Sequence, residues 1–286
     1  MDKMLYGFFV TLFGIATTLL TAAGLVYLEL HYDCAIYGYV YAFIVPMGAI
    51  LSGFVAASGY YFGSKLLSHR PGRGVLACVI AISGGNFFLI YWLEYILLKV
   101  DGEPIHSYIS YLDYLRFTLT HTSVTMNFGA VSNGDAINLG MGGYAYAALL
   151  IAGFAFGGFI IYNILRMAPF CESCGVYMKK QGSQTRYFVR YEDLAECFAA
   201  FKAEMEAGQF RRAMEVHADA GSRKLDASSG YSLRAEIKQC KGCGKQWAEL
   251  VAMQRVNKKW NRITNIKFSA YCTQRVDAIE ELASSS

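Results

Sequence analysis

The sequence predicts an α-helical membrane bundle followed by a small soluble α+β domain. Hydrophobic residues make up 55% of the 286 positions and charged residues only 17%, whereas an ordinary soluble domain carries about 25% charged residues. The charges are also unevenly distributed. Residues 1–166 contain 7 Lys/Arg and 8 Asp/Glu, whereas residues 167–286 contain 19 and 14. We therefore expect a membrane domain over residues 1–167 and a separate polar domain over residues 168–286.

Four transmembrane helices are expected in the first part, at about residues 5–30, 35–62, 75–98 and 141–167. Each segment has the ~20 residues that cross a ~30 Å hydrocarbon core. None shows the alternation of a barrel strand, so we expect helices, which satisfy their backbone polar groups internally. The first segment resembles the start of a secretory signal, but its apolar run is about twice as long. We therefore interpret it as a retained span.

The distribution of basic residues predicts the orientation of these helices. Arg70 and Arg73 lie between the second and third apolar segments, and Arg166 lies at the end of the fourth. The connection over residues 101–140 has a single Lys or Arg, Arg116. The positive-inside rule then places both termini in the cytoplasm. We expect an integral protein of the bacterial inner membrane, in contact with the lipid bilayer.

The connection over residues 101–140, which this orientation makes external, is expected to contain a surface helix at about residues 107–120. Tyr108, Leu112 and Leu115 recur there at helical spacing, and Leu119 continues the pattern. Such a helix would lie on the membrane surface or cap the bundle.

Small residues recur four positions apart within the expected spans, as in Gly53 and Ala57, Gly59 and Gly63, or Gly153 and Gly157. This spacing allows two helices to approach closely. We interpret it as packing within one bundle, with a homo-oligomeric contact as the alternative.

The polar part combines strand and helix patterns. Strands are expected at about residues 185–191, 231–238, 246–256 and 263–271, and two helices within residues 192–218. The prediction is a small α+β domain with a helical insertion at about residues 192–218.

Four cysteines in this part have the spacing of a metal site. Cys171 and Cys174 form one Cys-x-x-Cys-Gly motif, and Cys240 and Cys243 form a second. Two such pairs supply the four thiolates that bind zinc in closed structural sites. Iron in the same site is a less favoured alternative. A pair of redox dithiols is the other alternative, but no βαβ pattern precedes either motif.

These motifs and the strands around them resemble the zinc-ribbon fold group, over residues 171–175 and 231–271, with a long insertion between the two knuckles. The whole layout resembles a broad type of uncharacterised bacterial four-span inner-membrane protein with a cytoplasmic zinc-ribbon domain. That resemblance implies a structural zinc ion and no particular activity.

A weaker set of polar residues is expected on the external side. Glu94, Asp101, Glu103, His106 and His121 have side chains that bind divalent metals or transfer protons. We favour ordinary interfacial or solvated groups. For Glu94, near the end of an apolar helix, the alternatives are snorkelling, pairing with Lys99 or Arg116, or a functional site.

A basic hairpin is expected near the C-terminus, where cations accompany an aromatic side chain: Arg255, Lys258, Lys259, Trp260, Arg262 and Lys267. We favour a solvated hairpin, then contact with a partner protein or lipid, and consider nucleic acid the least favoured ligand.

No nucleophile–base pair, phosphate-binding loop or dinucleotide fingerprint occurs in the sequence. We therefore expect a membrane-anchored, non-enzymatic binding, scaffold or sensory protein with a protein partner in the cytoplasm. The alternative is a membrane enzyme or transporter that uses the external polar residues. It requires Glu94, Asp101, Glu103, His106 and His121 to converge on one pocket.

Overall fold

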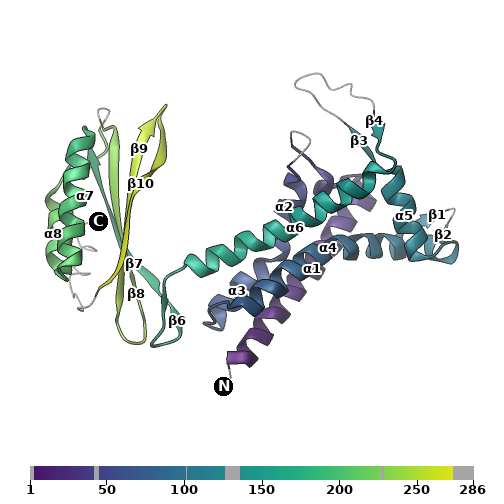
Figure 1. The fold of residues 1–286 in the computed structure, drawn as a ribbon, viewed down its shortest axis with the longest axis horizontal. Coiled ribbons are helices and arrows are strands. Elements are labelled where there is room, and N and C mark those ends of the chain that lie inside the picture. The colour runs from purple at the N-terminus through teal and green to yellow at the C-terminus, as the bar shows by residue number, and fades with distance from the viewer. Residues whose placement is uncertain (1–2, 42–44, 101, 126–135, 227–228, 273–286) are drawn as a thin grey trace. The chain divides into compact units, whose positions relative to one another are not determined.

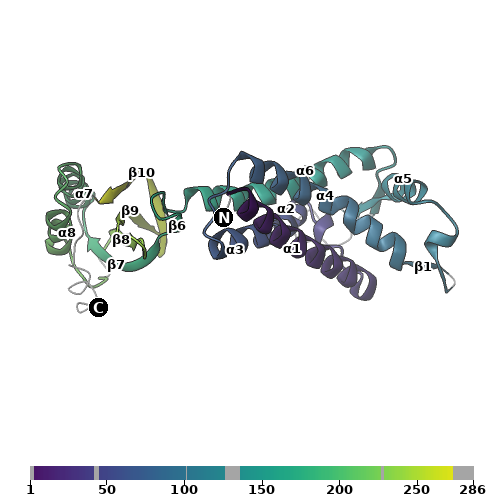
Figure 2. The ribbon, with the colours of Figure 1, turned by 90° about the horizontal axis from the view of Figure 1, so that it is seen from below.

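The computed structural model describes the chain except for residues 1–2, 42–44, 101, 126–135, 227–228 and 273–286 (Figures 1 and 2). The chain divides into two compact units, residues 1–167 and residues 168–286. The first unit is helical, and the second contains a four-stranded sheet with two helices.

Three helices of the first unit are long and apolar enough to cross a membrane: α1 (Lys3–Tyr32), α4 (Arg73–Leu97) and α6 (Gly142–Met167). They correspond, to within about two residues at each end, to the first, third and fourth segments expected from the sequence. Their length and composition support a membrane protein, because each exceeds the ~20 residues needed to span the hydrocarbon core.

The second expected span is not one continuous helix. It consists of a 3-10 turn, η1 (Ile36–Gly38), and two shorter helices, α2 (Met47–Ala56) and α3 (Ser58–Leu66). The expectation of a single helix over residues 35–62 was therefore wrong. Pro46 precedes α2, and proline both fixes its own φ and disfavours helical backbone in the residue before it. This explains why the helix begins so late.

The break between α2 and α3, at Ala57, is stabilised by a side chain of α1. The Thr17 hydroxyl donates a hydrogen bond to the Ala56 carbonyl oxygen over 2.7 Å and accepts one from the Gly59 backbone N–H over 3.1 Å. Backbone groups that lose their partners at a helix break are costly in an apolar interior. One hydroxyl satisfies two of them here.

The segment that contains η1, α2 and α3 runs antiparallel along α1. Tyr37, in η1, contacts Glu29 near the end of α1 through a hydrogen bond of 2.9 Å. Gly59, in α3, lies against the Phe13 carbonyl near the beginning of α1, so close that a Cβ atom at residue 59 would be 2.1 Å from that oxygen. The broken segment thus follows α1 for about 16 of its residues, or about 24 Å.

Helices α2 and α6 approach each other at glycines. A Cβ atom on Gly53 would lie 2.2 Å from the Phe154 carbonyl oxygen, and one on Gly157 would lie 2.3 Å from the Ile50 carbonyl oxygen. Only glycine permits backbones to come this close. The small-residue pattern of the sequence therefore packs helices within one chain here, as expected.

Along the chain, helix α5 (Tyr111–His121) comes between α4 and α6 and is preceded by the turn η2 (Ile105–Ser107). The helix begins later than residue 107 because Ser110 forms its N-cap and accepts a hydrogen bond from the Asp113 N–H. Tyr114 and Leu119 are buried, whereas Leu112 is exposed. Two short hairpins flank α5, formed by β1 (Lys99–Val100) with β2 (Glu103–Pro104) and by β3 (Ser123–Thr125) with β4 (Ala136–Asn138).

The second unit is built on an antiparallel sheet with strand order β10-β9-β8-β7. Its strands are β7 (Lys179–Phe188), β8 (Tyr231–Gln239), β9 (Gln246–Val256) and β10 (Lys259–Cys272). Helices α7 (Tyr191–Glu206) and α8 (Phe210–Asp219) cover one face and form the insertion between β7 and β8. Leu194, Phe201, Leu233 and Leu250 are fully buried between the two layers.

The glycine contact between α2 and α6 gives a prediction about stability. Gly157→Ala should lower the free energy of unfolding by about 1–3 kcal/mol, because the new methyl group overlaps the α2 backbone. Gly85→Ala in α4 is a matched control, since a Cβ atom there meets nothing within 4 Å. Thermal unfolding of the full-length protein in detergent should show a lower Tm for Gly157→Ala and not for Gly85→Ala. Equal Tm values for the two variants would contradict the close packing.

Candidate metal centre

The two cysteine motifs lie in turns at one end of the sheet unit. Cys171 and Cys174 belong to the hairpin formed by β5 (Phe170–Cys171) and β6 (Val176–Tyr177). Cys240 and Cys243 occupy the connection between β8 and β9. Two segments separated by the whole helical insertion therefore supply the ligands.

Both motifs adopt the same local turn. The Gly175 N–H donates to the Cys171 carbonyl oxygen over 2.8 Å, and the Gly244 N–H donates to the Cys240 carbonyl oxygen over 3.0 Å. Both glycines have positive φ angles, +64° and +74°. Glycine adopts this conformation without the steric cost of a Cβ atom, which is why it follows each Cys-x-x-Cys pair.

The four sulfur atoms converge. They lie within 4.8 Å of one another, and the Sγ atoms of Cys171 and Cys243 are 3.5 Å apart. A tetrahedral ion with metal–sulfur bonds of about 2.3 Å requires sulfur–sulfur distances of about 3.8 Å, so this arrangement fits one ion. The prediction that these four cysteines come together at a possible metal site is confirmed.

The surroundings hold the two motifs against each other. Cys171 and Cys240 are buried with Met178, and Trp247 packs against this group. The Lys245 ammonium donates a hydrogen bond to the Ser173 hydroxyl over 3.3 Å, which links the two turns directly. Cys174 is half-buried and Cys243 exposed, so the cluster lies at the edge of a small core at this end of the sheet.

Without a cation, the four thiols are unequal acids. The backbone N–H of Lys245, together with neighbouring thiols, lowers the pKa of Cys243 to about 7. The hydrogen bond between Cys174 and Cys243 raises the pKa of Cys174 to about 12. A divalent cation held by all four sulfur atoms would stabilise the thiolates together, and would have no coordination position left for a substrate.

The other cysteines lie apart from this cluster. Cys197 is buried and Cys78 half-buried, which agrees with a packing role, but Cys34 is exposed. The side chain of Cys272 lies outside the described residues.

The polar residues that were expected on the external side do not gather in the structure. Glu94 is buried, with 6% of its surface exposed, whereas Glu103, His106 and His121 are exposed. The His121 ring stacks on Phe117 with centroids 4.1 Å apart, and Asp101 lies outside the described residues. Among the residues that the structure describes, the four cysteines form the one group of three or more possible metal ligands.

Glu94 instead belongs to a network with a second carboxylate. The Tyr37 hydroxyl lies 3.0 Å from one Glu94 carboxylate oxygen and 2.9 Å from a Glu29 carboxylate oxygen. Tyr114 donates to the other oxygen of Glu94 over 3.4 Å. Neither Lys99 nor Arg116 forms an ion pair with Glu94 in the described part of the chain, which excludes the pairing considered from the sequence.

The hydrogen atoms of this network can be counted. A tyrosine hydroxyl has one proton and can donate to only one carboxylate at a time. Both contacts of Tyr37 become hydrogen bonds when one carboxyl group is protonated and donates to the Tyr37 oxygen, while Tyr37 donates to the other carboxylate. The Glu29–Tyr37–Glu94 network is thus suited to hold one shared proton. The sequence alone did not single out Tyr37 or Tyr114, because their contacts with Glu94 are made from other elements of the fold.

No protein-family model, curated protein or solved structure matches this chain. The fold and the site themselves define its class: a chain with apolar helices of membrane-spanning length and a sheet unit with a four-cysteine cluster.

The cluster predicts metal binding that depends on each motif. Purified full-length protein from zinc-supplied cells should contain about one metal ion per chain. Cys171→Ser and Cys240→Ser should each reduce this content at least about tenfold and lower the Tm, because metal binding contributes folding energy. Cys78→Ser, outside the cluster, is the control and should retain the metal. Elemental analysis by mass spectrometry gives the metal content, and equal content in Cys240→Ser and the wild type would disprove the site.

Proposed function

We propose that this protein is a membrane-anchored, non-enzymatic binding protein, in which four membrane crossings hold a cytoplasmic sheet unit stabilised by one zinc ion. The observation that carries the proposal is the closed set of four sulfur ligands, which suits a structural ion and leaves no position for a reaction.

Zinc is the ion that the donor set favours. Four thiolates arranged for tetrahedral coordination select zinc or iron. Zinc is the ion usually bound by two paired Cys-x-x-Cys motifs in a structural site. In the reducing cytoplasm the thiols do not become disulfides, which keeps them available to the metal.

The three long helices account for three of the four crossings. The remaining one, second in chain order, is assigned to the segment of η1, α2 and α3. It follows α1 from Glu29 back to Phe13, so the chain returns to the side on which α1 begins. With this crossing the number of spans is even, and both termini lie on the side of Arg70 and Arg73. The positive-inside rule makes that side the cytoplasm. This layout fits the bacterial four-span inner-membrane type that the sequence resembles.

A photo-crosslinking experiment tests the binding role. A photoreactive amino acid at residue 196, an exposed position of α7, should give a discrete protein adduct in living cells, because the proposal places α7 in the cytoplasm. The same amino acid at residue 156, an exposed apolar position of α6, is the control and should give no such adduct. Combination with Cys240→Ser should abolish the adduct at residue 196. Absence of a protein adduct from residue 196 and from other exposed positions of α7 and α8 would contradict the proposal.

A second candidate function, the transport of protons across the membrane, is favoured by the Glu29–Tyr37–Glu94 network. A buried carboxylate in a membrane helix is costly and is commonly retained for proton or ion movement. Here two carboxylates joined through one hydroxyl can exchange a proton without a counter-cation.

Reconstituted liposomes test this candidate. With a potassium-diffusion potential and a trapped pH dye, the wild type should move protons faster than protein-free liposomes do. Glu94→Gln should reduce the rate to the protein-free level, since the amide cannot release a proton, whereas Glu103→Gln, on an exposed side chain, should leave it unchanged. A wild-type rate equal to that of empty liposomes would eliminate the transport candidate.

A further inference from the structure

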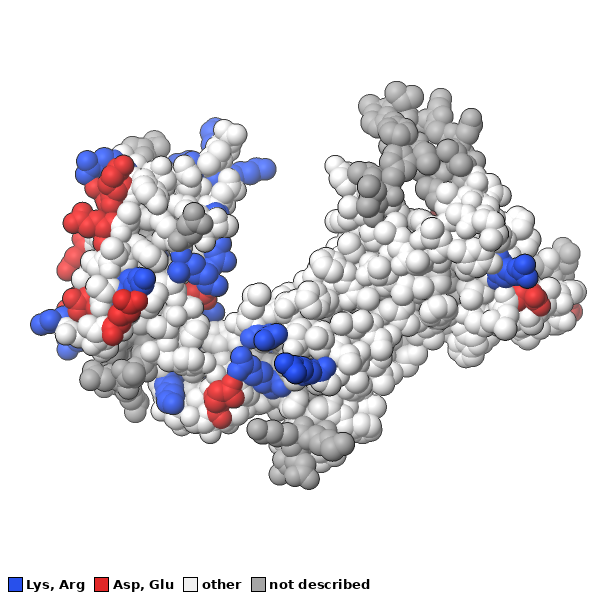
Figure 3. All heavy atoms as spheres, viewed as in Figure 1, with Lys and Arg blue, Asp and Glu red and all other residues white. Residues whose placement is uncertain are grey.

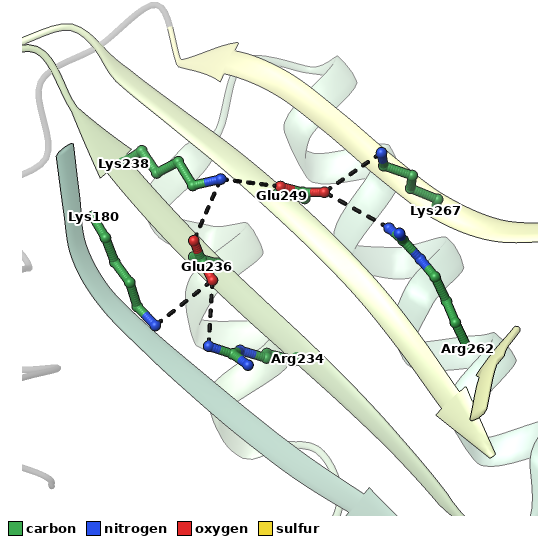
Figure 4. A network of polar contacts seen from close by, with 7 residues as sticks. All are labelled: Lys180, Arg234, Glu236, Lys238, Glu249, Arg262 and Lys267. Atoms are coloured by element: carbon green, nitrogen blue, oxygen red, sulfur yellow. Dashed lines mark hydrogen bonds and ion pairs between the residues drawn. The ribbon is translucent and has the colours of Figure 1, made fainter. Parts of the chain in front are cut away.

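The sheet face that is not covered by α7 and α8 carries a group of cations, which we call the basic face (Figure 4). It comprises Lys180, Arg234, Lys238, Arg262 and Lys267, together with Glu236 and Glu249. Alternation along the strands places these side chains opposite the buried residues Leu233 and Leu250. The side chains of Lys180, Arg262 and Lys267 are 46–49% exposed.

The two carboxylates do not neutralise the basic face. Glu236 contacts Lys180, Arg234 and Lys238 at 3.3–3.6 Å. Glu249 contacts Lys238, Arg262 and Lys267 at 3.3–3.7 Å. Five cations thus share two anions, which leaves three positive charges in excess. Ion pairs of exposed side chains are weak, so the half-exposed cations Lys180, Arg262 and Lys267 remain available to another anion.

The charge of the unit is polarised between its two layers. Strands β7–β10 contain nine Lys or Arg and two Glu, a formal net charge of +7. Helices α7 and α8 contain three Lys or Arg and seven Asp or Glu, a formal net charge of −4. Figure 3 shows acidic side chains over the helices and basic side chains over the sheet. The ligand that complements the basic face is therefore an anion.

The sheet also curves toward this ligand. The rings of Tyr187, on β7, and Trp260, on β10, have centroids only 5.9 Å apart. These are the two edge strands, which in a flat sheet would lie about 14 Å apart. The sheet therefore coils toward its open side (Figure 2), and Ser232, which pairs with Tyr187 across β7 and β8, is buried. A concave face lined with long cationic side chains suits compact anionic groups.

The connection to the membrane helix identifies the source of such groups. Helix α6 ends at Met167 and β5 begins at Phe170, so only two residues separate the last apolar helix from the sheet unit. Three Cα–Cα steps span at most about 11 Å. This is close to the distance over which the surface charge of a bilayer acts at physiological salt.

We propose that the basic face binds the phosphate headgroups of anionic phospholipids in the membrane that α6 crosses. The inference rests on the proposed membrane anchorage and cytoplasmic placement. Lipid is favoured over nucleic acid, because the negative surface that surrounds the tethered unit attracts the cations but repels a polyphosphate chain.

Lysine-reactivity mapping of the full-length protein tests this inference. The protein is placed in nanodiscs of phosphatidylcholine alone or with 30% phosphatidylglycerol, and acylation by an NHS ester is measured for each lysine. Lys180 and Lys267 should react at least about threefold more slowly in the anionic discs, because the surface potential raises the local proton concentration and the headgroups cover the amines. Lys202 on α7 is the internal control, since its side chain is 47% exposed, and it should be unaffected.

Two variants complete the test. Arg234→Gln combined with Arg262→Gln should remove the protection of Lys180 and Lys267, whereas Arg211→Gln combined with Arg212→Gln on α8 makes the same charge change and should retain it. Equal reactivity in both kinds of disc, or equal protection of Lys202, would overturn the inference. Protection by added RNA but not by phosphatidylglycerol would overturn it in favour of nucleic acid. The metal content and the adduct from residue 196 are measured on the same protein. Loss of either of these indicates a failure of the proposed function, whereas a failure of lysine protection alone concerns only the basic face.

Discussion

Four sulfur atoms connect parts of the sheet unit that the chain itself keeps far apart. Cys171 and Cys174 precede the helical insertion, and Cys240 and Cys243 follow it and the strand β8. Their convergence joins the β5–β6 hairpin to the β8–β9 turn at the end of the sheet where Trp247 packs against them. The position of that hairpin on the sheet, and therefore the point at which the chain enters the sheet unit, depends on this interaction.

In the helical unit, some polar groups that lipid cannot satisfy find partners on neighbouring helices, whereas the buried side chains of Asn86 and Tyr60 have no hydrogen-bond partner among the described residues. Thr17 satisfies two backbone groups at the break between α2 and α3, and Tyr37 connects Glu29 to Glu94. Glycine contacts bring α2 and α6 together, and Ala56 and Ala57 at the break are fully buried. Because an unsatisfied polar group in an apolar medium costs several kcal/mol, these few contacts constrain how the bundle can pack.

The sequence predicted those features that depend on composition or local spacing. The four cysteines were identifiable because two ligands two residues apart reach one ion only in a tight turn. The long helices α1, α4 and α6 followed from apolar runs.

The break at Ala57 was missed because its stabilisation comes from Thr17 on another helix, although Pro46 was a local signal. The partners of Glu94 lie on three other elements, and the curvature that joins Tyr187 to Trp260 depends on the whole sheet. Neither feature has a signature in a single segment.

The two-residue connection after Met167 is short only while the β5–β6 hairpin stays joined to the sheet. The backbone pairs of that hairpin are few, with Phe170 opposite Tyr177 and Cys171 opposite Val176. Release of the proposed metal ion would remove its connection between the hairpin and the β8–β9 turn. If the hairpin then opened as far as Lys179, twelve Cα–Cα steps would separate the membrane helix from strand β7, with an extended length of about 40 Å. The occupancy of the proposed metal site would then set the length of the tether, and with it how far from the end of α6 the sheet unit can move.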